Sequence, residues 1–127
     1  MSESYSGKEN ILEEDRLLRR LEHAPPDFII KPDGTPSSSC FSLKRGEDGL
    51  SVDIERLTTY ERSIQNPRRF RLFALRADYT SSLGLENVHD PVDGNNAHAL
   101  IKGDIKKTTA RKLAKNAVKI NYPPEDA

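Results

Sequence analysis

His98 is the residue of this sequence whose type and setting are best suited to chemistry. It follows Asn95 and Asn96, and it stands where a polar loop gives way to the apolar run 99–101. An imidazole can take up or release a proton near neutral pH, and functional groups are often carried at such loop edges. The competing interpretation is that His98 anchors the loop by bonding to a backbone carbonyl or a carboxylate.

Three further polar residues, Ser38, Ser39 and Asp53, can join His98 if the fold brings them together. His98, Ser39 and Asp53 form the candidate catalytic set of a small enzyme acting on a nucleotide, NAD or an RNA phosphodiester, with His98 as acid or base. No nucleophile-elbow, Walker or dinucleotide-binding glycine pattern accompanies them. Serines that follow a Pro-Gly turn, as these do, also serve as turn formers.

A second candidate site is basic. Between Lys102 and Lys119 there are seven basic side chains and one acidic side chain, which gives this segment a charge of +6. Its candidate binding residues are Lys106, Lys107, Arg111, Lys112, Lys115 and Lys119. Basic side chains on one helix can neutralise phosphates and release counterions. This pattern favours an accessory or interaction module that binds an acidic protein partner within a larger assembly, or a nucleic-acid backbone.

The alternative for the basic segment is a solvated helix face with no partner. No aromatic residue occurs at positions 80–121, so stacking on bases is not expected there. The charge is local, because the whole chain carries 20 acidic and 20 basic residues and has a net charge of zero. With Glu125 and Asp126 contributing −2, the first 101 residues carry −4, and we expect a positive field on one face.

Cysteine and histidine usage predicts neither a disulfide nor a metal site. Cys40 is the single cysteine, and His23, His89 and His98 lack the spacing that would place two ligands on one helix face. Cys40 precedes Phe41 and is predicted to be a small buried hydrophobe. The sequence predicts no cofactor, and its single thiol is typical of a reducing, cytoplasmic environment.

The length of 127 residues, of which 35% are hydrophobic, predicts one domain with a small core. We expect a flexible N-terminus at 1–9, a single domain at 10–122 and a tail at 123–127. No apolar run approaches the roughly 20 residues that cross a bilayer. Neither membrane insertion nor export is therefore predicted.

The first regular element is predicted to be a helix that begins at Asn10, where Asn10 and Glu13 have the form of a capping box. Leu17, Leu18 and Leu21 supply its apolar face, and the prolines at 25–26 end it. The apolar run LLRRLE is short, so a strand over these residues is the alternative.

The remaining pattern predicts a small single-domain α+β fold with a mixed or antiparallel sheet and with N-terminal and C-terminal helices. Strands are expected at 27–31, 39–44, 50–54, 68–77 and 97–103. The fourth is apolar on both faces and is the candidate central strand. A short helix capped by Thr58 is expected to end near Asn66, and one or two helical turns at 78–83 are expected to close at Gly84.

The last helix is predicted after Thr108 or Thr109, either of which can cap it. Its expected apolar stripe consists of Ala110, Leu113, Ala114 and Ala117. The basic residues occupy its other faces.

The segments SSSCF (37–41), LSVD (50–53), DPVDGNNAHALIKG (90–103) and ARKLAKNA (110–117) occur in this order along the chain. This succession resembles a family of small bacterial proteins with no activity known to us, over residues 17–123. The resemblance implies a shared fold and a bacterial source. In addition, an arginine at 19 or 20 followed by Ser38-Ser39 is similar to the ADP-ribosyltransferase arrangement that holds NAD, although no glutamate motif completes it.

Overall fold

The computed structural model of this chain describes residues 10–22, 31 and 34–120. Among these residues, six strands form one open sheet, in which every pairing is antiparallel and the order is β4-β5-β2-β1-β3-β6. The strands are β1 (Arg16–Glu22), β2 (Leu50–Ile54), β3 (Phe70–Arg76), β4 (Glu86–His89), β5 (His98–Lys102) and β6 (Val118–Ile120). The helices are α1 (Tyr60–Ile64), α2 (Ala77–Ser82) and α3 (Lys107–Asn116), with short 3-10 turns η1 (Ser38–Phe41) and η2 (Glu55–Leu57). The fold is thus α+β, as predicted.

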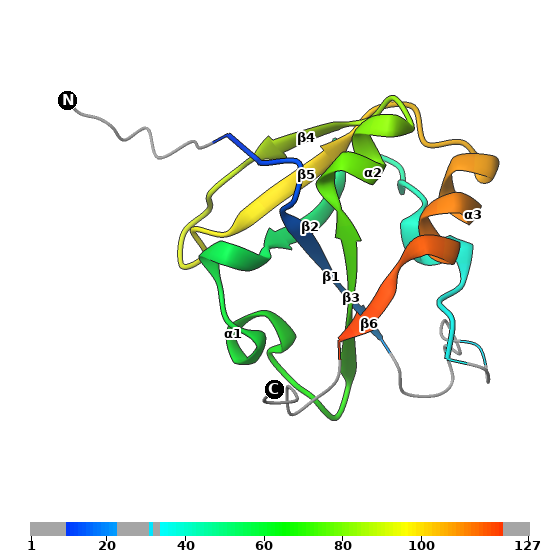
Figure 1. The fold of residues 1–127 in the computed structure, drawn as a ribbon. Helices are drawn as coiled ribbons and strands as arrows, with labels where there is room; N and C mark the ends of the chain where they lie inside the picture. The colour runs from blue at the N-terminus through cyan, green and yellow to red at the C-terminus, as the bar shows by residue number, and fades with distance from the viewer. Residues whose placement is uncertain (1–9, 23–30, 32–33, 121–127) are drawn as a thin grey trace.

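Consecutive side chains of β1 pack into two different hydrophobic cores, one on each face of the sheet. Leu17 and Leu21 pack on one face with β2, β3, η1 and α3, whereas Leu18 packs on the other face with Ile64 of α1. Figure 1 shows α3 and the cyan η1 segment on one side of the sheet and α1 on the other. The period of two in a strand produces this division, because neighbouring side chains point to opposite faces.

The predicted N-terminal helix is wrong. Residues 10–15 form no helix, and the segment Arg16–Glu22 is a strand that pairs with β3 along its whole length. A helix of about 12 residues is marginal on its own, and tertiary pairing overrides such local propensity. Asp15, just before β1, accepts hydrogen bonds from the Leu12 amide at 2.8 Å and from Arg56 Nε at 2.9 Å.

β3 is an interior strand, as its apolar residues on both faces predicted. Phe73 and Leu75 face one core, and Leu72 and Ala74 face the other. It lies between β1 and β6, but it is not the central strand that was predicted, because β2 and β1 occupy the middle of the sheet. The prediction of strands at 50–54 and 97–103 also agrees with β2 and β5.

Residues 39–44 do not form the predicted strand. Ser37 caps η1 by accepting a hydrogen bond from the Ser39 amide at 3.3 Å, and the Cys40 amide donates to the Ser37 carbonyl at 3.0 Å. Local serine bonds of this kind compete with strand pairing. The predicted strand at 27–31 and the predicted termini at 1–9 and 123–127 lie outside the described residues, apart from Lys31.

The helix boundaries differ from the prediction by small shifts. Thr59, not Thr58, caps α1 by accepting a hydrogen bond from the Arg62 amide at 3.2 Å. α2 ends before Gly84, whose φ of +82° is the conformation that glycine adopts without strain. The N-cap of α3 is Lys106, which makes no side-chain capping bond, so neither Thr108 nor Thr109 has the predicted role.

α3 buries Ala110, Leu113 and Ala114 of the predicted apolar stripe. The short strand β6 follows α3, so this helix is not the last regular element. None of the helices among the described residues has the length and apolar character needed to cross a membrane.

The strand assignment of β1 can be tested by truncating two leucines of the same segment. Leu18→Ala should lower the free energy of unfolding by about 2–5 kcal/mol, because a fully packed leucine is lost. Leu12→Ala, the matched control, should change it by less than about 0.5 kcal/mol, because this side chain is 45% exposed. Urea unfolding followed by circular dichroism measures both, and equal losses would support the helix instead.

Candidate functional site

Asp53 and His98 are direct neighbours in the sheet. They face each other across the antiparallel pair β2–β5, so their side chains share one face. Asp53 is 8% exposed, and both of its carboxylate oxygens are engaged. Oδ1 accepts from Asn95 Nδ2 at 2.8 Å, and Oδ2 accepts from Ser63 Oγ at 2.6 Å. Asp53 therefore holds α1 and the loop before β5 in place.

His98 uses one ring nitrogen for structure. Its Nδ1 lies 2.8 Å from the Asp90 carbonyl oxygen and 3.3 Å from Asp90 Oδ2. Because a carbonyl only accepts, Nδ1 carries the proton and donates, which leaves Nε2 as an acceptor in the neutral ring. Within the described part of the chain, Nε2 has no hydrogen-bond partner. The Nδ1 contact confirms the anchoring interpretation of His98, and the acid–base interpretation stays a prediction.

A cavity of about 130 Å³ opens where β1 and β2 separate. The two strands pair at only two positions, Leu17 with Ile54 and Leu18 with Asp53, and then diverge. We call this cavity the β1–β2 slot. It is lined by Leu18, Arg19, Arg20, Ser51, Val52, Asp53, Gln65, Asn95 and His98.

Arg19 bridges the separated strands. Its Nε donates to the Cys40 carbonyl at 2.7 Å, and its Nη1 donates to the Ser51 carbonyl at 2.8 Å. The guanidinium also lies 5.9 Å from the centre of the Phe41 ring. Burial lowers the pKa of Arg19, and the charge of Glu47 opposes this effect.

A wider cleft of about 570 Å³ adjoins the slot. The two share Arg19, Arg20 and Gln65 in their linings, and we call the wider one the outer cleft. The outer cleft is also lined by Leu21, Glu22, Ser39, Cys40, Ser42, Lys44 and Phe70.

Ser39 does not share a cavity with Asp53 and His98. It lines the outer cleft, and its Oγ lies 3.0 Å from Ser37 Oγ, whereas Asp53 and His98 line the slot. With the Asp53 carboxylate bonded to Ser63 and Asn95, the three residues of the candidate catalytic set do not form a Ser–His–Asp relay. Ser39 instead lies in one cleft with Arg19 and Arg20, the residues that the ADP-ribosyltransferase-like pattern paired with it.

The predicted basic residues are all exposed on and beside α3. We call Lys106, Lys107, Arg111, Lys112, Lys115 and Lys119 the basic face. Lys106 Nζ lies 3.6 Å from Asp104 Oδ2, and the other five make no ion pair with any described residue. The helix is held by the burial of Leu113 and its neighbours, so these charges stand on a rigid support.

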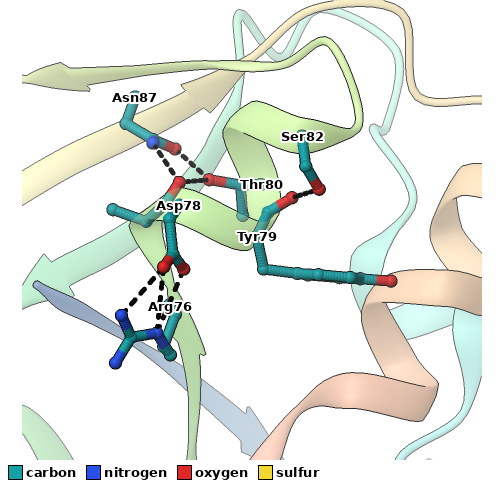
Figure 2. A network of polar contacts seen from close by, with 7 residues as sticks. Arg76, Asp78, Tyr79, Thr80, Ser82 and Asn87 are labelled. Carbon is teal, nitrogen blue, oxygen red and sulfur yellow. Dashed lines mark hydrogen bonds and ion pairs between the residues drawn. The ribbon is translucent and has the colours of Figure 1, made fainter. Parts of the chain in front are cut away.

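A groove that the sequence analysis missed lies beside the basic face, with a volume of about 610 Å³. It is lined by Arg16, Ala74, Arg76, Asp78, Tyr79, Asn116 and Val118. Figure 2 shows the Tyr79 ring extending from α2 toward α3 and Arg76 paired with Asp78. Tyr79 joins the two helices, because its hydroxyl accepts from Asn116 Nδ2 at 2.8 Å and donates to the Lys112 carbonyl at 3.3 Å. No sequence pattern indicated this groove, because residues as far apart in the chain as Arg16 and Val118 form it.

Cys40 is 7% exposed and belongs to the core, as predicted. Burial raises the pKa of its thiol, and the nearby charge of Arg19 opposes this shift. Among the described residues, no group of three or more histidine, cysteine, aspartate or glutamate side chains is placed to hold a metal ion.

The thiol makes stability depend on pH in a defined direction. The folded protein retains the Cys40 proton to a higher pH than the unfolded chain, whose thiol ionises near about 8.5. The contribution of the protonated Cys40 thiol to the free energy of unfolding is therefore complete below about pH 8.5, and it is lost as the pH rises above that value. Urea unfolding of wild type and Cys40→Ala at several pH values from 7 to 10 should show a steeper loss in wild type. Parallel curves would contradict the raised pKa.

Comparison of this chain with protein-family models, with curated proteins and with solved structures finds no match in any of the three. The functional inferences therefore rest on the geometry of the slot, the outer cleft and the basic face.

Proposed function

We propose that this protein is an interaction module that binds the phosphate backbone of double-stranded nucleic acid through the basic face. One observation carries the proposal. From Lys106 to Lys119 there are six exposed basic side chains and no acidic residue, in a chain whose net charge is zero. Such a local excess attracts a polyanion even when the average charge is neutral.

The spacing of the basic residues suits a linear array of phosphates. Lys107, Arg111 and Lys115 recur at intervals of four, so they lie along one side of α3 about 6 Å apart. Lys112 extends the same surface by one helical position, and Lys119 continues it onto the edge strand β6. A positive stripe with this periodicity can contact several phosphates at once.

The composition of this surface favours nucleic acid over an acidic protein. Five of its six residues are lysines, which are depleted at the centres of protein interfaces, whereas aromatic residues and arginine are enriched there. The surface also contains no aromatic residue on which unpaired bases could stack. These features favour contacts with the backbone of a duplex and recognition that is independent of sequence.

The proposal predicts salt-sensitive binding that depends on the charge of α3. With a labelled duplex DNA of mixed sequence, fluorescence anisotropy should give a log–log salt dependence with a slope of about −4. Lys112→Glu combined with Lys115→Glu should weaken binding at least about tenfold and reduce the slope by about 2. Wild-type affinity in this variant would show that the basic face is not the site.

A matched control makes the same change in net charge elsewhere. Arg62→Glu combined with Arg68→Glu alters two exposed arginines on α1 and the turn after it, on the opposite side of the sheet from α3. This variant should bind the duplex within about threefold of wild type. Poly-glutamate is the competing probe, and a preference for it over the duplex would assign the surface to an acidic protein partner instead.

One observation favours a second candidate function, an enzyme with His98 as acid or base. The Nδ1–H of His98 is held by Asp90, Nε2 remains an acceptor, and His98 lines the slot together with Arg19 and Arg20. This is the arrangement in which an imidazole is oriented for proton transfer. An NAD or RNA-phosphodiester substrate would place its phosphates near those arginines.

Substitution of the two described histidines separates this role from folding. With NAD and with a short RNA as substrates, wild type should show turnover and His98→Gln should lose it by at least about a hundredfold. His89→Gln is the control, because His89 Nε2 lies 2.7 Å from the Asn96 carbonyl and the side chain is buried. No turnover of either substrate by wild type, or equal activity of the His98 variant, would contradict the enzyme.

A further inference from the structure

We infer that the outer cleft and the β1–β2 slot form a binding site for a small organic phosphate, with Arg19 at its base and Lys44 at its rim. This site is separate from the basic face, and it requires no reaction at His98. Three observations support this site: Arg19 has no ion-pair partner among the described residues, the lining holds many hydrogen-bond donors, and the cleft has the volume of a small-molecule site.

Arg19 forms no ion pair within the described protein, and the Glu47 carboxylate acts on it only through its longer-range charge. The hydrogen-bond partners of Arg19 are two backbone carbonyls, and no carboxylate among the described residues lies within ion-pair distance. Arg16, Arg56 and Arg76, by contrast, each form an ion pair with an acidic side chain. Holding a guanidinium away from water without a counter-charge is costly, and an anionic ligand in the cleft would relieve that cost.

Arg20 contributes a second positive charge to the lining from the α1 face of β1, whereas Arg19 lies on the η1 face. Arg20 donates from Nη1 to the Ser63 carbonyl at 2.9 Å and lies 5.4 Å from the centre of the Phe70 ring. The acidic residue that lines the outer cleft, Glu22, pairs with Arg69 at 3.0 Å. The acidic side chain of the cleft wall is thus engaged with Arg69, and no described carboxylate forms an ion pair with Arg19 or Arg20.

The cleft contains more hydrogen-bond donors than one carboxylate group can accept. A guanidinium has five N–H donors, of which Arg19 uses two for the carbonyls. The ammonium of Lys44, the hydroxyl of Ser39 and the amide of Gln65 also line the cleft, whereas the Ser42 hydroxyl donates to the Ser38 carbonyl. A phosphate group offers three terminal oxygens and a larger negative charge, which fits this donor set better than a carboxylate.

Gln65 occupies a strained backbone position at the junction of the two cavities. Its φ of 61° and ψ of −54°, with the Asn66 amide bonded to the Ile64 carbonyl at 2.6 Å, describe a γ-turn with positive φ, which is rare. It is the single non-glycine residue with positive φ among those described. Strain of this kind concentrates at ligand sites, and here it places Gln65 in the lining of both cavities.

The volume of the outer cleft suits a phosphate attached to an organic group. At about 570 Å³ it lies within the range of small-molecule sites, and it is open enough to admit a ligand from solvent. The slot, at about 130 Å³, extends it past Arg19 toward His98. The phosphate is expected against Arg19 and the organic part toward the rim.

Ribose 5-phosphate is the test ligand, with ribose and inorganic phosphate as comparisons. Nitrogen–proton correlation spectra should show shifts at the amides of Ser39, Ser51 and Gln65 with the two phosphates and none with ribose. Arg19→Gln should weaken binding of ribose 5-phosphate at least about tenfold, because a charged hydrogen-bond donor is lost.

Arg19 also supports the fold, so a second variant is needed. Lys44→Ala changes an exposed side chain with no ion-pair partner among the described residues, and it should weaken binding about threefold to tenfold. Arg45→Ala, the exposed neighbour outside the lining, is the control and should bind as wild type does. Wild-type affinity in Lys44→Ala together with unchanged shifts in Arg19→Gln would overturn the site.

Two further outcomes would also overturn it. One is the absence of shifts with both phosphates up to about 10 mM, and the other is a set of shifts confined to α3. Lys112→Glu combined with Lys115→Glu distinguishes this inference from the proposed function. That variant should lose duplex binding and retain ribose 5-phosphate binding at wild-type affinity.

Discussion

The incomplete pairing of β1 with β2 is the constraint on which the candidate sites in the sheet depend. β1 pairs with β3 at seven positions and with β2 at only two, so the sheet opens beyond Leu18. Backbone groups at such an opening need other partners, because unpaired polar groups away from water are costly. Arg19 supplies two N–H donors to carbonyls on either side, at Cys40 and Ser51. One arginine thus closes the gap in the hydrogen bonding while leaving a cavity beside its guanidinium.

Asp53 of β2 likewise connects separate elements through its side chain. Its buried carboxylate draws Ser63 of α1 and Asn95 of the preceding loop toward the sheet. Those contacts set where the end of α1 and the start of β5 lie, and hence where Gln65 and His98 line the slot. A buried carboxylate with both oxygens satisfied is stable only while those partners remain. The sequence placed Asp53 in the candidate catalytic set with His98, but in the structure its carboxylate is bonded to Ser63 and Asn95 and positions their elements.

Several elements could be predicted because their signals are local. The alternation in Leu50–Ile54, the two apolar faces of Phe70–Arg76 and the stripe of α3 each repeat with the period of their element. The segment Arg16–Glu22 was ambiguous because its local pattern does not select one period. Leu17, Leu18 and Leu21 fit either a helix stripe or a strand with two buried faces. Its partner strand lies about fifty residues away, and that non-local pairing decided the outcome. β4 and β6 were missed because four and three residues are too few to display a period.

The sequence by itself determined the charge of the basic face, the burial of Cys40 and the α+β character, because composition and short-range periodicity set these properties. Only the tertiary structure decided which polar residues meet. It placed Asp53 beside His98 through strand register, moved Ser39 to a different cavity, and joined Arg19, Lys44 and Gln65 around one cleft. The physical reason is that strand pairing and helix packing bring together residues that are far apart in the chain. Which pairing forms depends on the packing of the whole core and not on any local segment.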